Sequence, residues 1–281
     1  MNKFILSGFS DEIDQDIKVQ FAALKKLGMS YFEPRGVNGT NIAKLSDEQL
    51  EELKKDMAEF GIKASSIGSP IGKIGICDDF EEHIEQLKRV IHIAKELGTR
   101  YIRMFSFFIP KGEDPANYRD EVMRRMKIMA EIAEENDVIL LHENEKDIYG
   151  DIAPRCADVL KTVNSPNLRA VFDPANFIQC GQKTYPEAYE LMAPYIEYMH
   201  IKDAIGETVV PAGVGEGDIE AILKELAAKG YDGFLSLEPH LGSFDGLADL
   251  EVGDEMLKLE RSSEEKFVVA HKALSAIIEK I

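Results

Sequence analysis

The chain is poor in positive charge, in cysteine and in long apolar runs. Its 281 residues carry 33 Lys and Arg against 51 Asp and Glu, which gives a formal net charge of −18 at pH 7. A surface of that sign repels phosphate backbones and anionic lipid headgroups, so it argues against nucleic-acid and membrane partners. The same charge also serves ordinary solubility.

The cysteines do not form a disulfide framework. Cys77, Cys156 and Cys180 are odd in number, widely spaced and outside any CxxC arrangement, which favours buried or incidental thiols in a reducing compartment. No apolar stretch of signal-peptide length opens the chain, and no run is long enough to span a membrane. We therefore expect a cytoplasmic protein.

Short apolar segments that end in polar side chains alternate with helical patterns along the chain. The segments predicted to be strands cover residues 4–6, 31–35, 62–67, 101–107, 138–145, 168–173, 196–203 and 233–238. Helical patterns follow them near residues 17–27, 46–60, 80–97, 117–135, from 153 onwards, and at 185–192, 219–228 and 262–281.

Eight strands and eight helices in strict alternation, at roughly 27 to 40 residues per unit, predict an α/β fold. The simplest architecture is a single (β/α)8 TIM barrel that forms one domain over residues 1–281. An open doubly wound sheet is the weaker alternative, because no GxGxxG follows the first strand. The irregular, acidic residues 241–261 are expected to form an extended final βα loop.

The fifth to the eighth predicted strands each end in, or contain, a side chain that can bind a hard metal ion. These side chains are Glu143, Asp173, His200 and Glu238. Inward-facing residues alternate along barrel strands, and the carboxyl ends of the strands open on one mouth, so the four can converge. Each alone has an ordinary explanation, as a solvated strand end or a core histidine. The shared placement predicts one divalent cation, Mn²⁺ first, with Mg²⁺, Co²⁺ or Zn²⁺ also possible.

With these residues in place, the sequence resembles the xylose-isomerase-like barrels, the superfamily of sugar phosphate isomerases and epimerases. The resemblance covers essentially the whole chain and rests on Glu143-Asn144, Asp173, His200-Ile-Lys-Asp203, the Gly213–Asp218 turn and Glu238-Pro239. It implies that the four positions hold one divalent cation and that Glu143 and Glu238 are the acid/base pair. It also implies a homo-dimer or tetramer, since barrels of this family often pair.

The ligand set predicts proton transfer, and the resemblance implies that the substrate is a small sugar or sugar phosphate. A cation that chelates a carbonyl and a neighbouring hydroxyl stabilises an enediolate, and burial in an apolar site would raise the proton affinity of the glutamates. Proton return to the same carbon gives epimerisation, and return to the neighbouring carbon gives aldose–ketose isomerisation. We therefore expect a metal-dependent isomerase or epimerase.

Further side chains near the predicted mouth are candidates for binding substrate: Arg35, Lys73, Arg103, Asn176, Lys202, Glu216 and His240. The cations could hold a phosphate or carboxylate, arginine in a bidentate manner. Ion pairing with acids such as Glu33 and Asp203 is an equal alternative for Arg35 and Arg103. Asn176 stands where ketose 3-epimerases of the family usually have a histidine, which weakens the case for a free-ketose 3-epimerase.

Three other functions compete with the isomerase. A metal-dependent dehydratase or lyase on a polyol or keto-acid also begins with an enolate and stays open. A non-catalytic sugar-binding barrel is the alternative from a different class. A DNA-repair endonuclease of the same superfamily is rejected, because it would need several extra histidines and a basic face, whereas this chain has 6 histidines and a charge of −18.

Overall fold

Six strands form one parallel sheet at the centre of the fold. The computed structural model describes residues 4–243 and 260–281. The strands of this sheet are β1 (Ile5–Gly8), β6 (Tyr101–Met104), β7 (Ile139–Glu143), β8 (Leu168–Phe172), β9 (Ile196–Ile201) and β12 (Phe234–Leu237). Their order in space is β1, β12, β9, β8, β7, β6, and every neighbouring pair is parallel. Parallel order brings the carboxyl ends of all six strands to the same edge.

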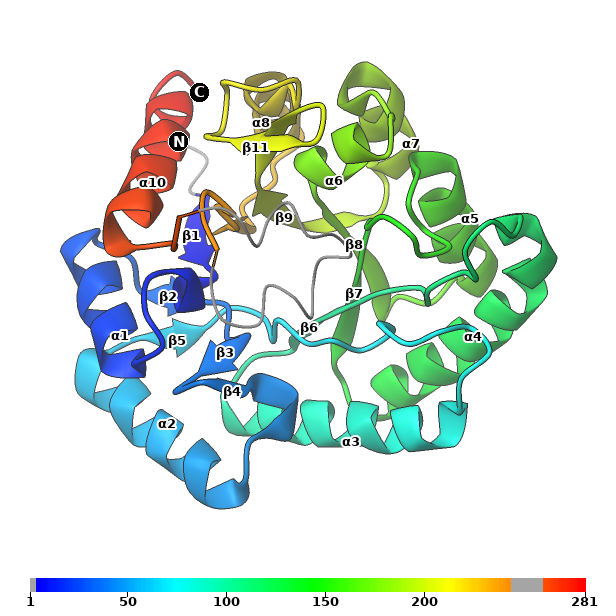
Figure 1. Ribbon diagram of the computed structural model, residues 1–281, viewed down its shortest axis with the longest axis horizontal. Coiled ribbons are helices and arrows are strands. Elements are labelled where there is room, and N and C mark those ends of the chain that lie inside the picture. Colours follow the sequence, from blue (N-terminus) through cyan, green and yellow to red (C-terminus); the bar gives the residue numbers. More distant parts are fainter. Residues whose placement is uncertain (1–3, 244–259) are drawn as a thin grey trace.

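Helices surround the strands on the outside (Figure 1). They are α1 (Ile17–Lys26), α2 (Asp47–Phe60), α3 (Phe80–Glu96), α4 (Arg119–Glu135), α5 (Ala153–Val163), α6 (Pro174–Gln179), α7 (Tyr189–Met192), α8 (Ile219–Ala228) and α10 (Glu264–Ile278). Local chemistry sets their ends: a reciprocal Ser46–Gln49 capping box starts α2, and the left-handed Gly61 ends it. The last helix, α10, lies between α1 and α8 (Figure 1).

Two short parallel strands, β2 (Tyr31–Phe32) and β5 (Lys63–Ala64), stand in the remaining part of the circle. The Glu33 N–H donates to the Gly8 carbonyl at 2.9 Å, and the Arg103 N–H donates to the Ile67 carbonyl at 2.9 Å. Both strands are shorter than the predicted 31–35 and 62–67. Pro34 has no N–H to extend the β2 ladder, although its carbonyl still accepts from the Gly68 N–H at 2.9 Å.

The other predicted elements differ from the structure mainly at their ends. The strand predicted at 101–107 ends at Met104, and Phe107 adopts a left-handed φ of 68° that no strand contains. Small antiparallel pairs that the sequence pattern did not reveal are β3 (Gly36–Val37) with β4 (Thr40–Asn41), and β10 (Asp203–Ile205) with β11 (Thr208–Val210). Single turns of other helix types cover Ser10–Glu12, Ile42–Lys44, Pro115–Tyr118 and Thr184–Ala188.

A small apolar cluster is separate from the main core that joins sheet and helices. It consists of Ile139, Leu141, Val171 and Tyr198. Successive strand residues point to opposite faces, so Glu143 faces the same side as Ile139 and Leu141. This cluster therefore forms the base of the site described below.

The predicted final loop at 241–261 falls mostly on residues 244–259, which lie outside the described residues. Its two described ends meet: the Ser243 N–H donates to the Glu260 carbonyl at 2.9 Å, and the Ser262 N–H donates to the Ser243 carbonyl at 2.6 Å. Across the ranges 4–243 and 260–281, no helix has the length and apolar character that crossing a membrane requires.

Candidate functional site

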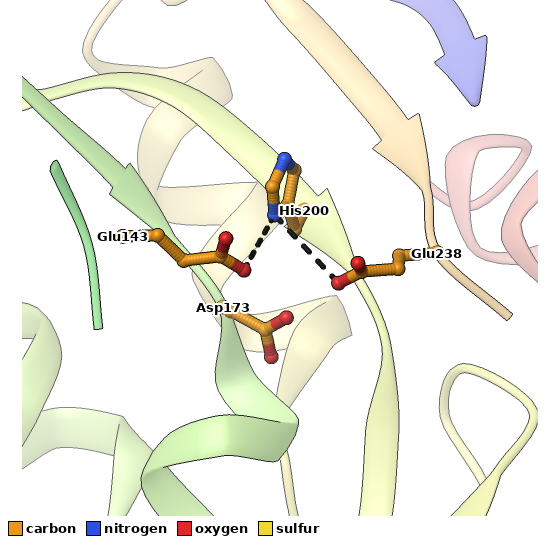
Figure 2. A group of neighbouring side chains, drawn as sticks. All are labelled: Glu143, Asp173, His200 and Glu238. Carbon is orange, nitrogen blue, oxygen red and sulfur yellow. Dashed lines mark hydrogen bonds and ion pairs between the residues drawn. The ribbon is translucent and has the colours of Figure 1, made fainter. Parts of the chain in front are cut away.

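Four side chains converge at the carboxyl ends of neighbouring strands. Glu143 is the last residue of β7, Asp173 follows β8, His200 lies in β9 and Glu238 follows β12. Each side chain offers one ligand atom, and these four atoms lie within 4.8 Å of one another. Figure 2 shows the side chains pointing toward one shared space. All four residues are at most 2 % exposed.

The donor atoms suit one divalent cation. His200 Nδ1 lies 2.8 Å from Glu143 Oε1 and 3.8 Å from Glu238 Oε2. Within the described ranges, Glu143 Oε2 and Asp173 Oδ2 are buried without a hydrogen-bond donor in suitable geometry. Three carboxylates and one imidazole are a hard, oxygen-rich set, and two ligands on opposite sides of one ion lie about 4 to 4.5 Å apart. The residues therefore fit the group that the sequence predicts here.

Lys202 brings a buried ammonium into the site. Its Nζ lies 3.0 Å from Asp173 Oδ2 and 2.9 Å from Glu238 Oε2, and the residue is 4 % exposed. Lys202 directly follows β9 and is two residues after His200, so its side chain points to the same side as that of His200.

Two arginines complete the cationic side of the site. Arg103 Nη1 lies 3.4 Å from Glu143 Oε2 and 3.5 Å from Glu238 Oε1. Arg35 donates in a bidentate manner to Asp11 at 2.8 and 2.9 Å, and its Nη1 lies 3.1 Å from Glu238 Oε1. For these arginines, the sequence left open ion pairing with acids or a place at the predicted mouth. The structure shows both, because each arginine pairs with an acid of the cluster.

The cations reverse the expected pKa shift of the two glutamates. Burial raises the pKa of Glu143, but His200 and Arg103 outweigh it, and the net pKa lies below the ordinary value. Burial likewise raises the pKa of Glu238, and Lys202, His240 and His200 together hold the net pKa well below its usual range. The prediction that an apolar site would raise the proton affinity of the glutamates is wrong, because the site is lined with charge.

The other two ligand residues shift in the opposite sense. Burial raises the pKa of Asp173 to about 7, although Lys202 acts against this. Burial lowers the pKa of His200, but Glu143 and Glu33 more than compensate and raise it to about 10. Without a metal ion, the histidine is therefore a cation held between carboxylates.

His240 lies beside Glu238, with its Nε2 3.5 Å from Glu238 Oε1. Its backbone is left-handed (φ 43°), and its N–H donates to Glu12 Oε2 at 2.8 Å. Burial raises the pKa of Glu12 to about 7. Asp11 and Glu12 are not among the site residues predicted from the sequence. The pattern that could have indicated them is a pair of acids shortly after the first strand.

Asn176 lies beside Glu143, whereas the described contacts of Lys73 are with Glu145 and Phe105. Asn176 Nδ2 donates to the Asn144 carbonyl at 2.9 Å and lies 3.4 Å from Glu143 Oε1. Lys73 Nζ pairs with Glu145 Oε2 at 3.2 Å and lies 4.5 Å from the centre of the Phe105 ring.

Glu216 is exposed and is not brought to the four-residue cluster. Its Oε2 accepts from the Gly206 N–H at 3.5 Å, at the turn between β10 and β11.

Asp203 organises the glycine-rich turn around Glu216. Its Oδ1 accepts from the Ala204 and Gly217 N–H groups at 2.9 and 2.8 Å, and its Oδ2 accepts from Gly213 and Gly215 at 2.8 and 3.0 Å. Asp203 is fully buried. The sequence suggested an arginine as the partner of Asp203, but its carboxylate is instead bonded by four backbone N–H groups.

The sequence pattern of the family described as xylose isomerase-like TIM barrel matches residues 21–259. The chain belongs to this family. A 3-dehydroshikimate dehydratase of Bacillus anthracis is 22% identical to this xylose isomerase-like barrel over 174 residues, which are 61% of this chain and 62% of that relative. The match thus spans about three fifths of the curated relative.

Solved structures share the fold at low sequence identity. A D-allulose 3-epimerase from Methylomonas sp., in complex with D-allulose, superposes with a TM-score of 0.75 at 15% identity and covers 100% of this chain and 98% of its own. A xylose isomerase-like TIM barrel protein from Mycobacterium smegmatis, in complex with magnesium, gives 0.71 at 18% identity over 98% and 97%. At these identities the likeness establishes the TIM barrel fold of the family.

Proposed function

We propose that this chain is a divalent-metal-dependent sugar or sugar phosphate isomerase or epimerase that transfers a proton through an enediolate. The observation that carries the proposal is the convergence of Glu143, Asp173, His200 and Glu238 within 4.8 Å. A divalent cation bound by these residues, Mn²⁺ by preference, would stabilise the negative charge that develops on the substrate when the α-proton leaves.

Glu143 and Glu238 are the proposed acid/base pair. They lie on β7 and after β12, on two sides of the cluster, so one can remove a proton and the other can return it. Their depressed pKa values keep both ionised at neutral pH, which is the state a base needs. The glutamate that returns a proton must therefore first take one from solvent, and the base gives its proton back to solvent after each turnover. A carboxylate of low pKa is a weak base, so the reaction depends on a substrate proton made acidic at the metal site.

The substrate would be oriented by buried polar groups around this pair. Arg35, Arg103, Lys202 and His240 are each at most 4 % exposed and lie within 3.6 Å of a carboxylate of the cluster. Asn176 is held by Asn144 and Glu143. We also propose that Lys73 and Glu216 contact the substrate, from the rim of the site and further from the four-residue cluster.

A dehydratase acting on a keto-acid is the second candidate. The buried cations Arg35, Arg103 and Lys202 favour a substrate with a carboxylate. The similarity to a dehydratase over 174 residues points the same way. Such a reaction starts with the same proton removal by Glu143 or Glu238 and continues with loss of a hydroxyl group.

We also propose that the barrel has eight strands and is one domain over residues 1–281. The hydrogen bonds from Glu33 to Gly8 and from Arg103 to Ile67 support strands two and three as the link between β1 and β6. A cytoplasmic homo-dimer or tetramer that binds neither nucleic acid nor membrane remains part of this proposal.

The deciding experiment is solvent deuterium exchange. Wild type and the variants Glu143→Gln, Glu238→Gln and Glu197→Gln are incubated in D₂O with Mn²⁺ and a panel of ketoses, their phosphates, polyol ketones and cyclic keto-acids. Glu197 lies on β9 and bonds the Tyr101 hydroxyl at 2.9 Å, so its variant is the matched control.

We expect deuterium at the carbon next to the carbonyl with wild type and Glu197→Gln, and at least about 10²-fold less with the other two variants. Product that has also lost water identifies the dehydratase. If the protein binds a sugar but shows neither deuterium exchange nor bound metal, it is a non-catalytic barrel and the proposal is contradicted.

A further inference from the structure

A layer of buried polar side chains lies directly below the four-residue cluster. We call it the polar layer: Ser7, Glu33, Ser65, Tyr198 and Ser236. Ser7 and Ser236 are paired residues of β1 and β12, and Ser236 is paired with His200 of β9. All five residues are at most 1 % exposed.

Hydrogen bonds join the layer and converge on one carboxylate oxygen. Glu33 Oε2 accepts from Ser236 Oγ at 2.7 Å and from the Tyr198 hydroxyl at 3.0 Å. The Tyr198 hydroxyl also lies 2.9 Å from Ser65 Oγ, which is 2.6 Å from Ser7 Oγ. The interior of a TIM barrel is ordinarily filled with branched apolar side chains, and a buried carboxylate is costly unless it is well bonded. A layer of buried polar side chains inside the barrel therefore indicates a functional role.

The partner of Glu33 is the imidazole of the cluster. Glu33 Oε2 lies 3.4 Å from His200 Nε2, an ion-pair distance at which Nε2 makes no hydrogen bond of good geometry within the described residues. The opposite ring nitrogen, Nδ1, lies 2.8 Å from Glu143 Oε1. The edges of Phe9 and Tyr198 pack against the ring at centroid distances of 5.2 and 5.9 Å. The ring held by these contacts presents Nδ1 to Glu143 and Glu238, and Nε2 to Glu33.

We infer that Glu33 is a positioning residue for His200. An imidazole that binds a metal through Nδ1 must keep its proton on Nε2, and Glu33 Oε2 is the carboxylate oxygen beside that nitrogen, 3.4 Å away. Ser236 and Tyr198 in turn fix the Glu33 carboxylate. This inference rests on the proposed metal-dependent function, and it assigns to Glu33 the choice of tautomer and the strength of the histidine ligand.

The test measures metal affinity separately from turnover. Mg²⁺ and Mn²⁺ are titrated into metal-free wild type, Glu33→Gln, Ser236→Ala and the charge control Glu145→Gln, whose acid pairs with Lys73 instead of His200. We expect Glu33→Gln to weaken metal binding about 10- to 100-fold. Ser236→Ala should weaken it less, and Glu145→Gln should stay within about threefold. In the Mg²⁺ form, the Nε2–H proton signal of His200 should move upfield in Glu33→Gln, because the charged acceptor is lost.

The possible outcomes separate the two proposals. Wild type that binds no metal overturns the proposed function and this inference with it. Wild-type affinity in folded Glu33→Gln, or an equal loss in Glu145→Gln, overturns the inference alone. If Glu33→Gln does not fold, Ser236→Ala and Tyr198→Phe decide, since each removes one hydrogen bond to the same oxygen, and an unchanged affinity and Nε2–H signal in both would refute it.

Discussion

Metal binding should release protons in a number that changes with pH in a defined way. Glu143 and Glu238 have depressed pKa values and are already ionised at neutral pH, so they release none. His200, with a pKa of about 10, must lose the proton on Nδ1 to become a ligand. Asp173, with a pKa of about 7, must lose whatever fraction of its proton remains. The release is therefore the sum of the titrations of His200 and Asp173.

The sum gives a specific curve. The release should be about one proton per metal ion near pH 8, about one and a half near pH 7, and about two near pH 6. Since the slope of log affinity against pH equals the number of protons released, affinity should tighten about 1,000-fold between pH 6 and pH 8. Titration calorimetry of Mg²⁺ or Mn²⁺ in buffers of different ionisation enthalpy measures the proton count directly.

Fewer than about half a proton at pH 8 would refute the reasoning, because it would mean that His200 is already neutral between Glu143 and Glu33. A release of about one proton at all three pH values would instead show that Asp173 is ionised throughout. The Asp173→Asn variant serves as the control for the second titration: any binding that it retains should show one proton and no change with pH.

Two further predictions concern stability. Gly215→Ala should destabilise the fold by about 2 kcal/mol or more, because a Cβ at Gly215 would meet Asp203 Oδ1 and the Ala204 carbonyl. The control Gly206→Ala should cost about 1 kcal/mol, because nothing lies within 4 Å of a Cβ there and only the positive φ is strained. Equal urea midpoints for the two variants would contradict this. Burial holds His83 neutral and lowers its pKa to about 4, below the unfolded value. Its own contribution to the stability of the metal-free protein, up to about 3 kcal/mol, should therefore be lost as pH falls from about 6.5 to 4. Urea unfolding across that pH range should show a shallower loss in His83→Gln.

Strand periodicity was sufficient to predict where the central site lies. Glu143, His200 and Glu238 converge because parallel strands have one carboxyl edge and their side chains alternate, and both rules can be read from spacing. Lys202, two residues after His200, lies on the same side by the same rule. No such rule predicts the shortness of the second strand, which ends at Phe32, or the presence of β10 and β11.

Contacts made by loops could not be predicted in this way. His240 reaches Glu238 and Glu12 through a left-handed backbone that histidine rarely adopts. Glu33, named from the sequence only as a partner for arginine, lies instead beneath His200. Both placements depend on how one strand end faces another across the barrel, and that information is absent from local spacing.

The carboxylate of Asp203 also bears on the choice of substrate. Successive backbone N–H groups in a glycine-rich turn form a concave site of positive potential, and in many proteins such a site binds a phosphate. Here the N–H groups of Gly213, Gly215 and Gly217 already donate to Asp203, at 2.8 to 3.0 Å. The chain thus supplies its own anion to this turn. A phosphorylated sugar would have to place its phosphate against the arginine and lysine side chains, where it would compete with the carboxylates they already pair with.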